Sequence, residues 1–102
     1  MINRSLLLEL FDQNEAFVAR VLQIFKDQVP AQFDALQTAV GEGDFGNASI
    51  LAHNIKSQCH YLGVSEAVSL CETLENEPDS FETPARLATL EVIIANILKE
   101  IL

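Results

Sequence analysis

The sequence has little positive charge. Its 102 residues include six Lys and Arg against 15 Asp and Glu, which gives a net charge of -9. A chain with this balance repels the phosphates of nucleic acids, which basic proteins neutralise. It also lacks the basic cluster that attracts an anionic membrane surface. We therefore expect neither nucleic acid nor a membrane among its binding partners.

Cysteine, glycine and long apolar runs are also scarce. The chain has two cysteines and four glycines, although 49% of its residues are hydrophobic. Met1 to Arg4 lead directly into an amphipathic pattern, so we expect no signal peptide. Two cysteines then favour reduced, packed thiols over a disulfide framework. No apolar run approaches the roughly 20 residues that span a bilayer. We expect one soluble domain over residues 1–102, cytoplasmic and monomeric.

Several motifs of enzymes are absent as well. The sequence has no glycine-rich phosphate loop, so we do not expect it to bind ATP unaided, and it has no Gly-x-Ser-x-Gly nucleophile elbow. His53 and His60 would lie about 10 Å apart along a helix, too far to share one ion. We therefore expect no metal site and no cofactor.

Hydrophobic periodicity and capping signals predict five helical stretches and no strands. The first covers residues 5–11, after a possible Asn3 cap. A capping box at 12–15 opens the second, which ends at 41–43. The third runs from an Asp44 cap to about residue 62, and Ser65 caps the fourth, which ends before a loop at 76–80. The fifth starts at Thr83, as a capping hydroxyl before a proline, and continues to the C-terminus.

Long helices joined by short loops favour an all-α fold, an antiparallel up-down four-helix bundle with a short extra N-terminal helix. An irregular all-helical array is the alternative. Pro30 interrupts the second helix, but the apolar pattern continues past it, so we expect a bend and not a break. The apolar positions of this helix are Val18, Val21, Leu22, Phe25, Val29, Phe33, Leu36 and Val40. We expect three aromatic residues elsewhere to be packing residues, namely Phe45, Tyr61 and Phe81.

On a helical wheel of the third helix, His53 lies opposite the apolar face. Lys56, Ser57 and His60 share its side, and Gln58 borders the core. Such a polar face is often simply a solvated surface. An exposed imidazole can also accept a phosphoryl group, because neutral imidazole is a nucleophile near neutral pH. Lys56, one turn away, can neutralise charge on the phosphoryl oxygens. The remaining apolar face predicts the core residues Ala48, Leu51, Ala52, Ile55, Cys59 and Leu62.

The residues around His53 resemble the histidine-containing phosphotransfer (HPt) domain family. The family pattern is His-x-Leu-Lys-Gly, then Leu-Gly, then Leu-x-x-x-Cys-x-x-Leu-Glu. This sequence has Ala-His-Asn-Ile-Lys-Ser at 52–57, Leu-Gly at 62–63 and Leu-Cys-Glu-Thr-Leu-Glu at 70–75. The resemblance implies a phosphocarrier, not an independent enzyme, that relays a phosphoryl group between His53 and aspartates of response-regulator receiver domains. An upstream hybrid histidine kinase is then a further partner, and the receiver supplies Mg²⁺.

The resemblance also implies roles for single residues. Lys56 steadies the phosphoryl group, Gly63 ends the motif helix, and Ser57 replaces the usual glycine and can support the phosphoryl group. Receivers in the family dock around the histidine on the first, second and motif helices. The docking residues expected here are Phe17, Val21, Ile24, Gln28 and His60, with Leu7 as a weaker candidate. Two alternatives stay open: a helical interaction or adaptor module with an incidental histidine, and a metal- or thiol-using enzyme.

Overall fold

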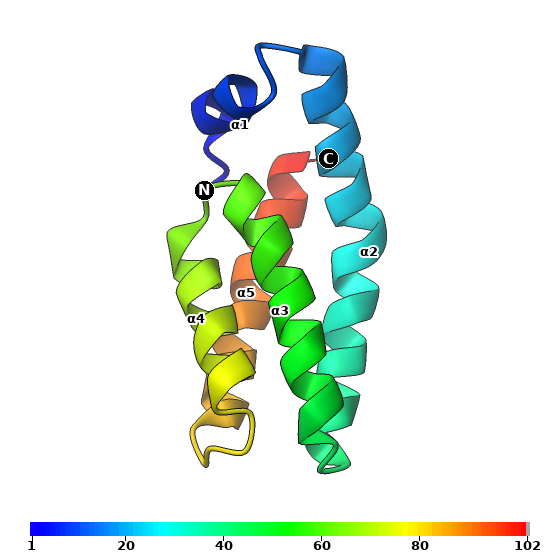
Figure 1. The fold of residues 1–102 in the computed structure, drawn as a ribbon, viewed down its shortest axis with the longest axis vertical. Helices are drawn as coiled ribbons and strands as arrows, with labels where there is room; N and C mark the ends of the chain where they lie inside the picture. Colours follow the sequence, from blue (N-terminus) through cyan, green and yellow to red (C-terminus); the bar gives the residue numbers. More distant parts are fainter. Residues whose placement is uncertain (102) are drawn as a thin grey trace.

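The computed structural model describes residues 1–101 and is all-helical over that range. Its helices are α1 (Arg4–Leu10), α2 (Glu15–Gly41), α3 (Phe45–Tyr61), α4 (Ser65–Asn76) and α5 (Thr83–Ile101). Figure 1 shows α2 to α5 side by side along the long axis, with α1 at the end where α2 begins. The prediction of an all-helical bundle with a short extra N-terminal helix is confirmed.

The core is apolar and receives side chains from all of these helices. In α2 the buried positions recur every three or four residues and continue past Pro30, so the helix remains one element. Val21 and Val40 are only partly buried, and Ala39 takes a core position that the pattern did not mark. Leu7 of α1 is fully buried. The prediction that Leu7 is a docking residue is therefore wrong. Helix α1 packs against α2 and α3 and places this side chain in the core.

Small side chains line the contact between α3 and its neighbours. Ala48, Ala52 and Cys59 of α3 are fully buried, as are Ala67 and Cys71 of α4. The distance between packed helices depends on the side chains at the contact, so small residues permit a close approach. Accordingly, α3 packs more closely against α2 and α4 than α5 does against its neighbours. Side chains on the outer edges of α3 and α4 are thereby brought within reach of one another.

Two of the predicted helix starts are wrong in detail. Asn14, not Asp12, caps α2: its side chain accepts a hydrogen bond from the Phe17 amide. Asp12 has a φ of +54° and lies in a left-handed turn before the helix, so the expected capping box does not form. Ser65 is the first residue of α4, and Val64 occupies the capping position without a side-chain hydrogen bond. The predicted caps Asn3 and Asp44 are confirmed.

Thr83 begins α5, but its hydroxyl does not cap the helix. The side chain is buried, and Oγ1 donates to the carbonyls of Glu77 and Pro78 at 3.4 and 3.1 Å. A buried hydroxyl needs a partner, and here the preceding loop supplies two. Instead of capping α5, the Thr83 side chain therefore stabilises the loop that precedes the helix.

The three aromatic residues expected to pack are exposed instead. Phe45 and Tyr61, the first and last residues of α3, are 38% and 46% exposed, and the ring centre of Tyr61 is 6.2 Å from that of Phe11. Phe81 lies between α4 and α5 and is 91% exposed. Hydrophobic periodicity predicts burial only for residues within a helix, so it gave no information on the exposure of Phe81 in its loop.

We predict that Gly63→Ala destabilises the protein. Gly63 ends α3 with a φ of +71°, and an added Cβ would lie 2.8 Å from the Cβ of Asn3. We expect the free energy of unfolding to fall by about 1–3 kcal/mol, from the left-handed backbone and the displaced Asn3. Urea unfolding followed by circular dichroism measures this change. The control Gly46→Ala, in open space within α3, should instead stabilise by about 0.5–1 kcal/mol. Equal stability of Gly63→Ala and the wild type would contradict the prediction.

Candidate functional site

His53 projects from the middle of α3 into solvent. Its side chain is 57% exposed, as its position on the wheel predicted. One edge of the ring is nevertheless held in place, because Nδ1 lies 3.0 Å from Oε1 and 3.3 Å from Oε2 of Glu75. Glu75 belongs to the last turn of α4. The imidazole is therefore oriented by a carboxylate from the neighbouring helix.

The same carboxylate also binds Lys56. Lys56 Nζ lies 2.8 Å from Glu75 Oε1, and both side chains are less than a quarter exposed. The backbone of Glu75 is fixed as well, since its carbonyl accepts a hydrogen bond of 2.6 Å from the Ser49 hydroxyl. Glu75 thus joins the two α3 residues that the sequence predicted for phosphoryl chemistry. They form a cluster of His53, Lys56 and Glu75, which we call the triad.

The electrostatics of the triad follow from these contacts. The hydrogen bond from Lys56 holds the pKa of the Glu75 carboxyl below its ordinary value, and the contact with His53 acts in the same direction against partial burial. Reciprocally, the hydrogen bond to Glu75 raises the pKa of Lys56. Glu75 is therefore ionised and Lys56 protonated at neutral pH.

The ionised carboxylate determines which ring nitrogen of His53 is free. A carboxylate only accepts hydrogen bonds, so Nδ1 must carry the proton that is donated to Glu75. In the neutral ring, Nε2 then has a free lone pair. This tautomer is assigned from the hydrogen-bond network. The arrangement leaves a nucleophilic nitrogen on the edge of the ring that is directed away from Glu75.

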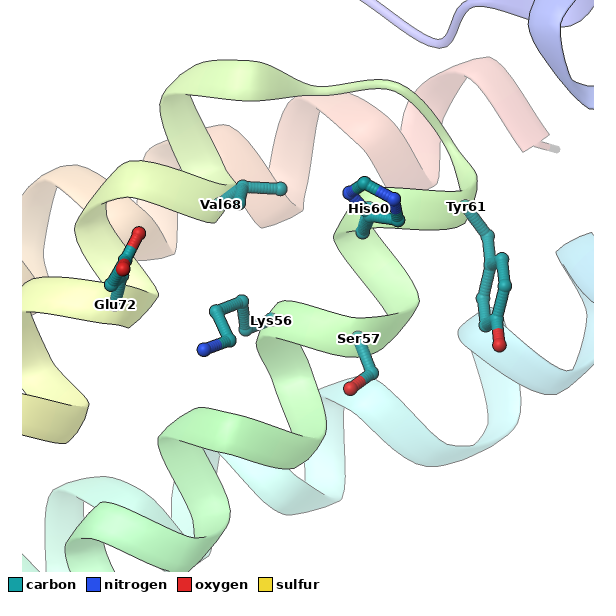
Figure 2. A pocket seen from close by; sticks show the side chains of 6 residues that line it. All are labelled: Lys56, Ser57, His60, Tyr61, Val68 and Glu72. Carbon is teal, nitrogen blue, oxygen red and sulfur yellow. The ribbon is translucent and has the colours of Figure 1, made fainter.

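The surroundings of the triad differ in charge from the rest of the chain. Helix α3 contains no Asp or Glu, although the chain has 15 of them, and its side chains on this face that can carry a positive charge are Lys56 and the two histidines. Figure 2 shows the adjacent groove between α3 and α4, where Lys56 and His60 extend from α3 beside Val68 and Glu72 of α4. On α3 itself this face carries no negative charge, and the carboxylates beside it are Glu72 and Glu75 of α4.

The placement of the histidines, carboxylates and cysteines bears on the alternative of a metal- or thiol-using enzyme. Within residues 1–101 no group of three or more His, Cys, Asp or Glu side chains is placed to hold a metal ion. Cys59 and Cys71 are free thiols buried between α3 and α4. A hydrogen bond with Cys59 and burial both raise the pKa of Cys71, which disfavours its reactive thiolate form.

Comparison with known proteins decides the family. A family model described as the Hpt domain matches residues 20–100, which include all three residues of the triad. The chain belongs to the Hpt domain family. No curated protein and no solved structure matched it. Hpt domains are phosphocarrier modules with a histidine phosphotransfer role in phosphorelays, so the resemblance found in the sequence is confirmed.

The docking residues predicted for this Hpt domain fall into two groups. Phe17 is exposed and its ring stacks on Phe11 at 5.5 Å, next to Tyr61. Val21 and Ile24 are partly buried, which is consistent with positions at the edge of the core. Exposed Gln28 accepts a hydrogen bond from Gln58 of α3 at 3.1 Å, so this pair connects α2 to α3. His60 is exposed on the other side of α3, beside the groove toward α4.

Ser57 is small and exposed beside His53, as predicted for the position where the family usually has glycine. Its hydroxyl donates to the His53 carbonyl at 3.2 Å, one turn back along α3. To support a phosphoryl group, the hydroxyl would have to rotate out of this hydrogen bond. In this structure the Ser57 hydroxyl therefore binds the backbone of His53, and its side chain remains exposed to solvent.

Two residues beside His53 were not predicted from the sequence, namely the ionised Glu75 and the exposed Ile50. Glu75 was noted only as the last residue of the family motif, with no role assigned to it. Ile50 lies one turn before His53, is 62% exposed, and lines a recess with Ser49, His53 and Glu75. The motif itself was the available signal for Glu75, and a solvent-facing isoleucine on the His53 side of the wheel was the signal for Ile50.

The pKa of Glu75 gives a prediction for stability against pH. Because this pKa is lowered by folding, ionised Glu75 stabilises the protein above its ordinary value of 4.5, and this contribution is lost as the pH falls through the lower folded value. Glu75→Gln should therefore lower the urea midpoint at pH 7. The difference from the wild type should shrink when the measurement is repeated below pH 4.5.

The matched control for this measurement is Glu91→Gln, which removes an exposed carboxylate of α5 that has no ion pair within residues 1–101. Its urea midpoint should stay near that of the wild type at both pH values. A Glu75→Gln variant as stable as the wild type at pH 7 would show that the triad contributes nothing to stability.

Proposed function

We propose that this Hpt domain accepts a phosphoryl group on Nε2 of His53 and passes it to or from an aspartate of a receiver domain. Its partners are the receiver domain of a response regulator and an upstream hybrid histidine kinase, and it acts as a monomeric cytoplasmic phosphocarrier. The observation that carries the proposal is the contact of Nδ1 with the Glu75 carboxylate, because it leaves Nε2 as the free nucleophile.

The transfer balances as an in-line displacement. The Nε2 lone pair attacks the phosphorus of the aspartyl phosphate, a nitrogen–phosphorus bond forms, and the phosphorus–oxygen bond to the aspartate breaks. The aspartate leaves as a carboxylate. The imidazole ring becomes cationic during the attack because Nδ1 keeps its proton. Glu75, already bonded to that nitrogen, compensates the positive charge, and the reverse steps return the phosphoryl group to an aspartate.

Lys56 is close enough to His53 to stabilise the phosphoryl group. Its Nζ binds the same carboxylate oxygen as His53 Nδ1, so the ammonium group and the imidazole ring are neighbours. When phosphoryl oxygens are present, Lys56 can turn from Glu75 toward them and offset their negative charge. Mg²⁺ belongs in this proposal to the receiver domain, whose own carboxylates would hold it. No side chain of this Hpt domain is assigned as a ligand for it.

The surface beside the triad supports docking of a receiver. The predicted docking residues of α2, Val21, Ile24 and Gln28, are uncharged, and Gln28 binds Gln58 of α3. Phe17, one turn before Val21, belongs to an aromatic cluster with Phe11 and Tyr61. An apolar centre inside a polar rim is the usual composition of a protein interface. In a chain with a net charge of -9, an uncharged face also allows the acidic active site of a receiver to approach.

We predict that His53→Gln abolishes phosphorylation. A receiver domain charged with radiolabelled phosphate, incubated with the wild type and Mg²⁺, should give acid-labile, alkali-stable label on this Hpt domain, because a phosphoramidate has that stability. The His53→Gln variant should take up none. The control is His60→Gln, which removes the other histidine of α3: with His53 intact it should still take up label, at a rate that falls only as far as His60 contributes to docking.

Two outcomes would refute the assignment of His53. Label that persists in His53→Gln would place the phosphoryl group on another residue. A wild-type protein that binds charged receivers but is never labelled would instead be an adaptor module with an incidental histidine.

We predict that Lys56→Ala slows phosphotransfer on the order of 100-fold, as expected for the loss of one group that stabilises a transition-state charge. The single-turnover rate from the charged receiver measures this effect, and helix content by circular dichroism should not change. Lys99→Ala, which removes an exposed lysine from the last turn of α5, should transfer at the wild-type rate. An unchanged rate in Lys56→Ala would remove Lys56 from the mechanism.

A further inference from the structure

The segment between α4 and α5 exposes an aromatic ring to solvent. Phe81 is 91% exposed, more than any other large hydrophobic side chain among the described residues. It lies in the 77–82 loop, which joins the last turn of α4 to the first of α5 (Figure 1). Large aromatic side chains dominate the energetics of protein interfaces, so a fully exposed one on a fixed loop is a candidate contact residue.

The 77–82 loop is held in one conformation by several hydrogen bonds. The buried Thr83 hydroxyl binds the carbonyls of Glu77 and Pro78, and the Thr83 amide donates to the Ser80 carbonyl at 3.0 Å. The Ser80 hydroxyl accepts from the Glu82 amide at 3.2 Å. A partner that binds Phe81 therefore does not have to order a flexible loop, which reduces the cost of binding.

The loop is also strongly acidic. Its six residues include Glu77, Asp79 and Glu82, and the sequence has no Lys or Arg between Lys56 and Arg86. Arg86 binds Glu82 at 2.9 Å and approaches Glu77 at 3.7 Å, so it compensates only part of this charge. The charge argues against a second copy of this chain, which carries the same acidic loop, and against an anionic membrane. It favours a partner surface with basic side chains.

The loop is connected to the phosphorylation site. Glu75, which orients His53, precedes the loop by two residues, and its carbonyl is bound to Ser49 of α3. Six residues span at most about 21 Å, so Phe81 cannot lie farther than this from Glu75. A standard interface covers about 800 Å² on each partner and can include both points. One protein can therefore contact His53 and Phe81 at the same time.

We propose that Phe81 is a docking residue for a protein that exchanges phosphoryl groups with His53 and has an apolar pocket bordered by Lys or Arg. Phe81 enters the pocket, and the carboxylates beside it pair with the basic border. The 77–82 loop and the start of α2 lie at opposite ends of the bundle (Figure 1), so partners of His53 can differ in whether they contact Phe81 or the aromatic cluster of Phe11, Phe17 and Tyr61. This inference rests on the proposed function, because it concerns partners of the same histidine.

The test uses phosphotransfer kinetics with purified receiver domains from the host organism. For each receiver that exchanges phosphate with the wild type, the rate is measured over a range of receiver concentrations. With at least one of them, Phe81→Ser should raise the half-saturating concentration about tenfold or more and leave the maximal rate unchanged. Asp79→Asn should raise it less, and only at low salt, because salt screens exposed charges.

Two controls distinguish a loss of docking from a general loss of apolar surface and from damage to His53. Val92→Ser removes an apolar side chain of α5 that is also exposed, and should behave as the wild type with every receiver. Phosphoramidate, a small donor that needs no docking surface, should phosphorylate wild type and Phe81→Ser equally at His53.

The outcomes are distinguishable. A Phe81→Ser variant with wild-type half-saturation for every active receiver would overturn the docking role and leave the proposed function intact. A change in the sedimentation mass of the protein alone in Phe81→Ser would assign Phe81 to self-association instead. Failure of phosphoramidate and of every receiver to label the wild type would refute the proposed function, and this inference with it.

Discussion

The close approach of α3 and α4 is the constraint on which the site depends. Alanine and cysteine side chains at the contact leave little between the two backbones, so groups at the outer edge of one helix can bind groups on the other. Glu75 uses this proximity to hold both His53 and Lys56. Larger core residues at these positions would separate the helices and break the triad without altering any of its members.

In the proposed function, the triad prepares His53 for reaction. A single ionised carboxylate fixes the ring, selects its tautomer and is available to balance the charge that develops on the ring. The lysine bound to the same carboxylate is held on the side of the ring that faces Glu75. The helices hold the triad in place, and the proposed function assigns the groups that drive transfer to the receiver domain.

Much of the fold and part of the site could be predicted from the sequence. The helices followed from apolar periodicity, and the outward position of His53 and Lys56 followed from the wheel of one helix. The role of Glu75 could not be derived in this way, because it depends on how two helices pack. Leu7 and Phe81 were misplaced for a related reason: their exposure is set by how a short helix and a loop lie on the bundle.

The nitrogen resonances of the His53 ring test the central claim most directly. In histidine-labelled protein, a long-range ¹H–¹⁵N spectrum recorded before and after phosphorylation reports the tautomer and the site of attachment together. We predict a proton on Nδ1 in the free protein, and phosphorus coupling at Nε2 after phosphorylation. A neutral ring protonated on Nε2, or phosphorus attached to Nδ1, would contradict the account.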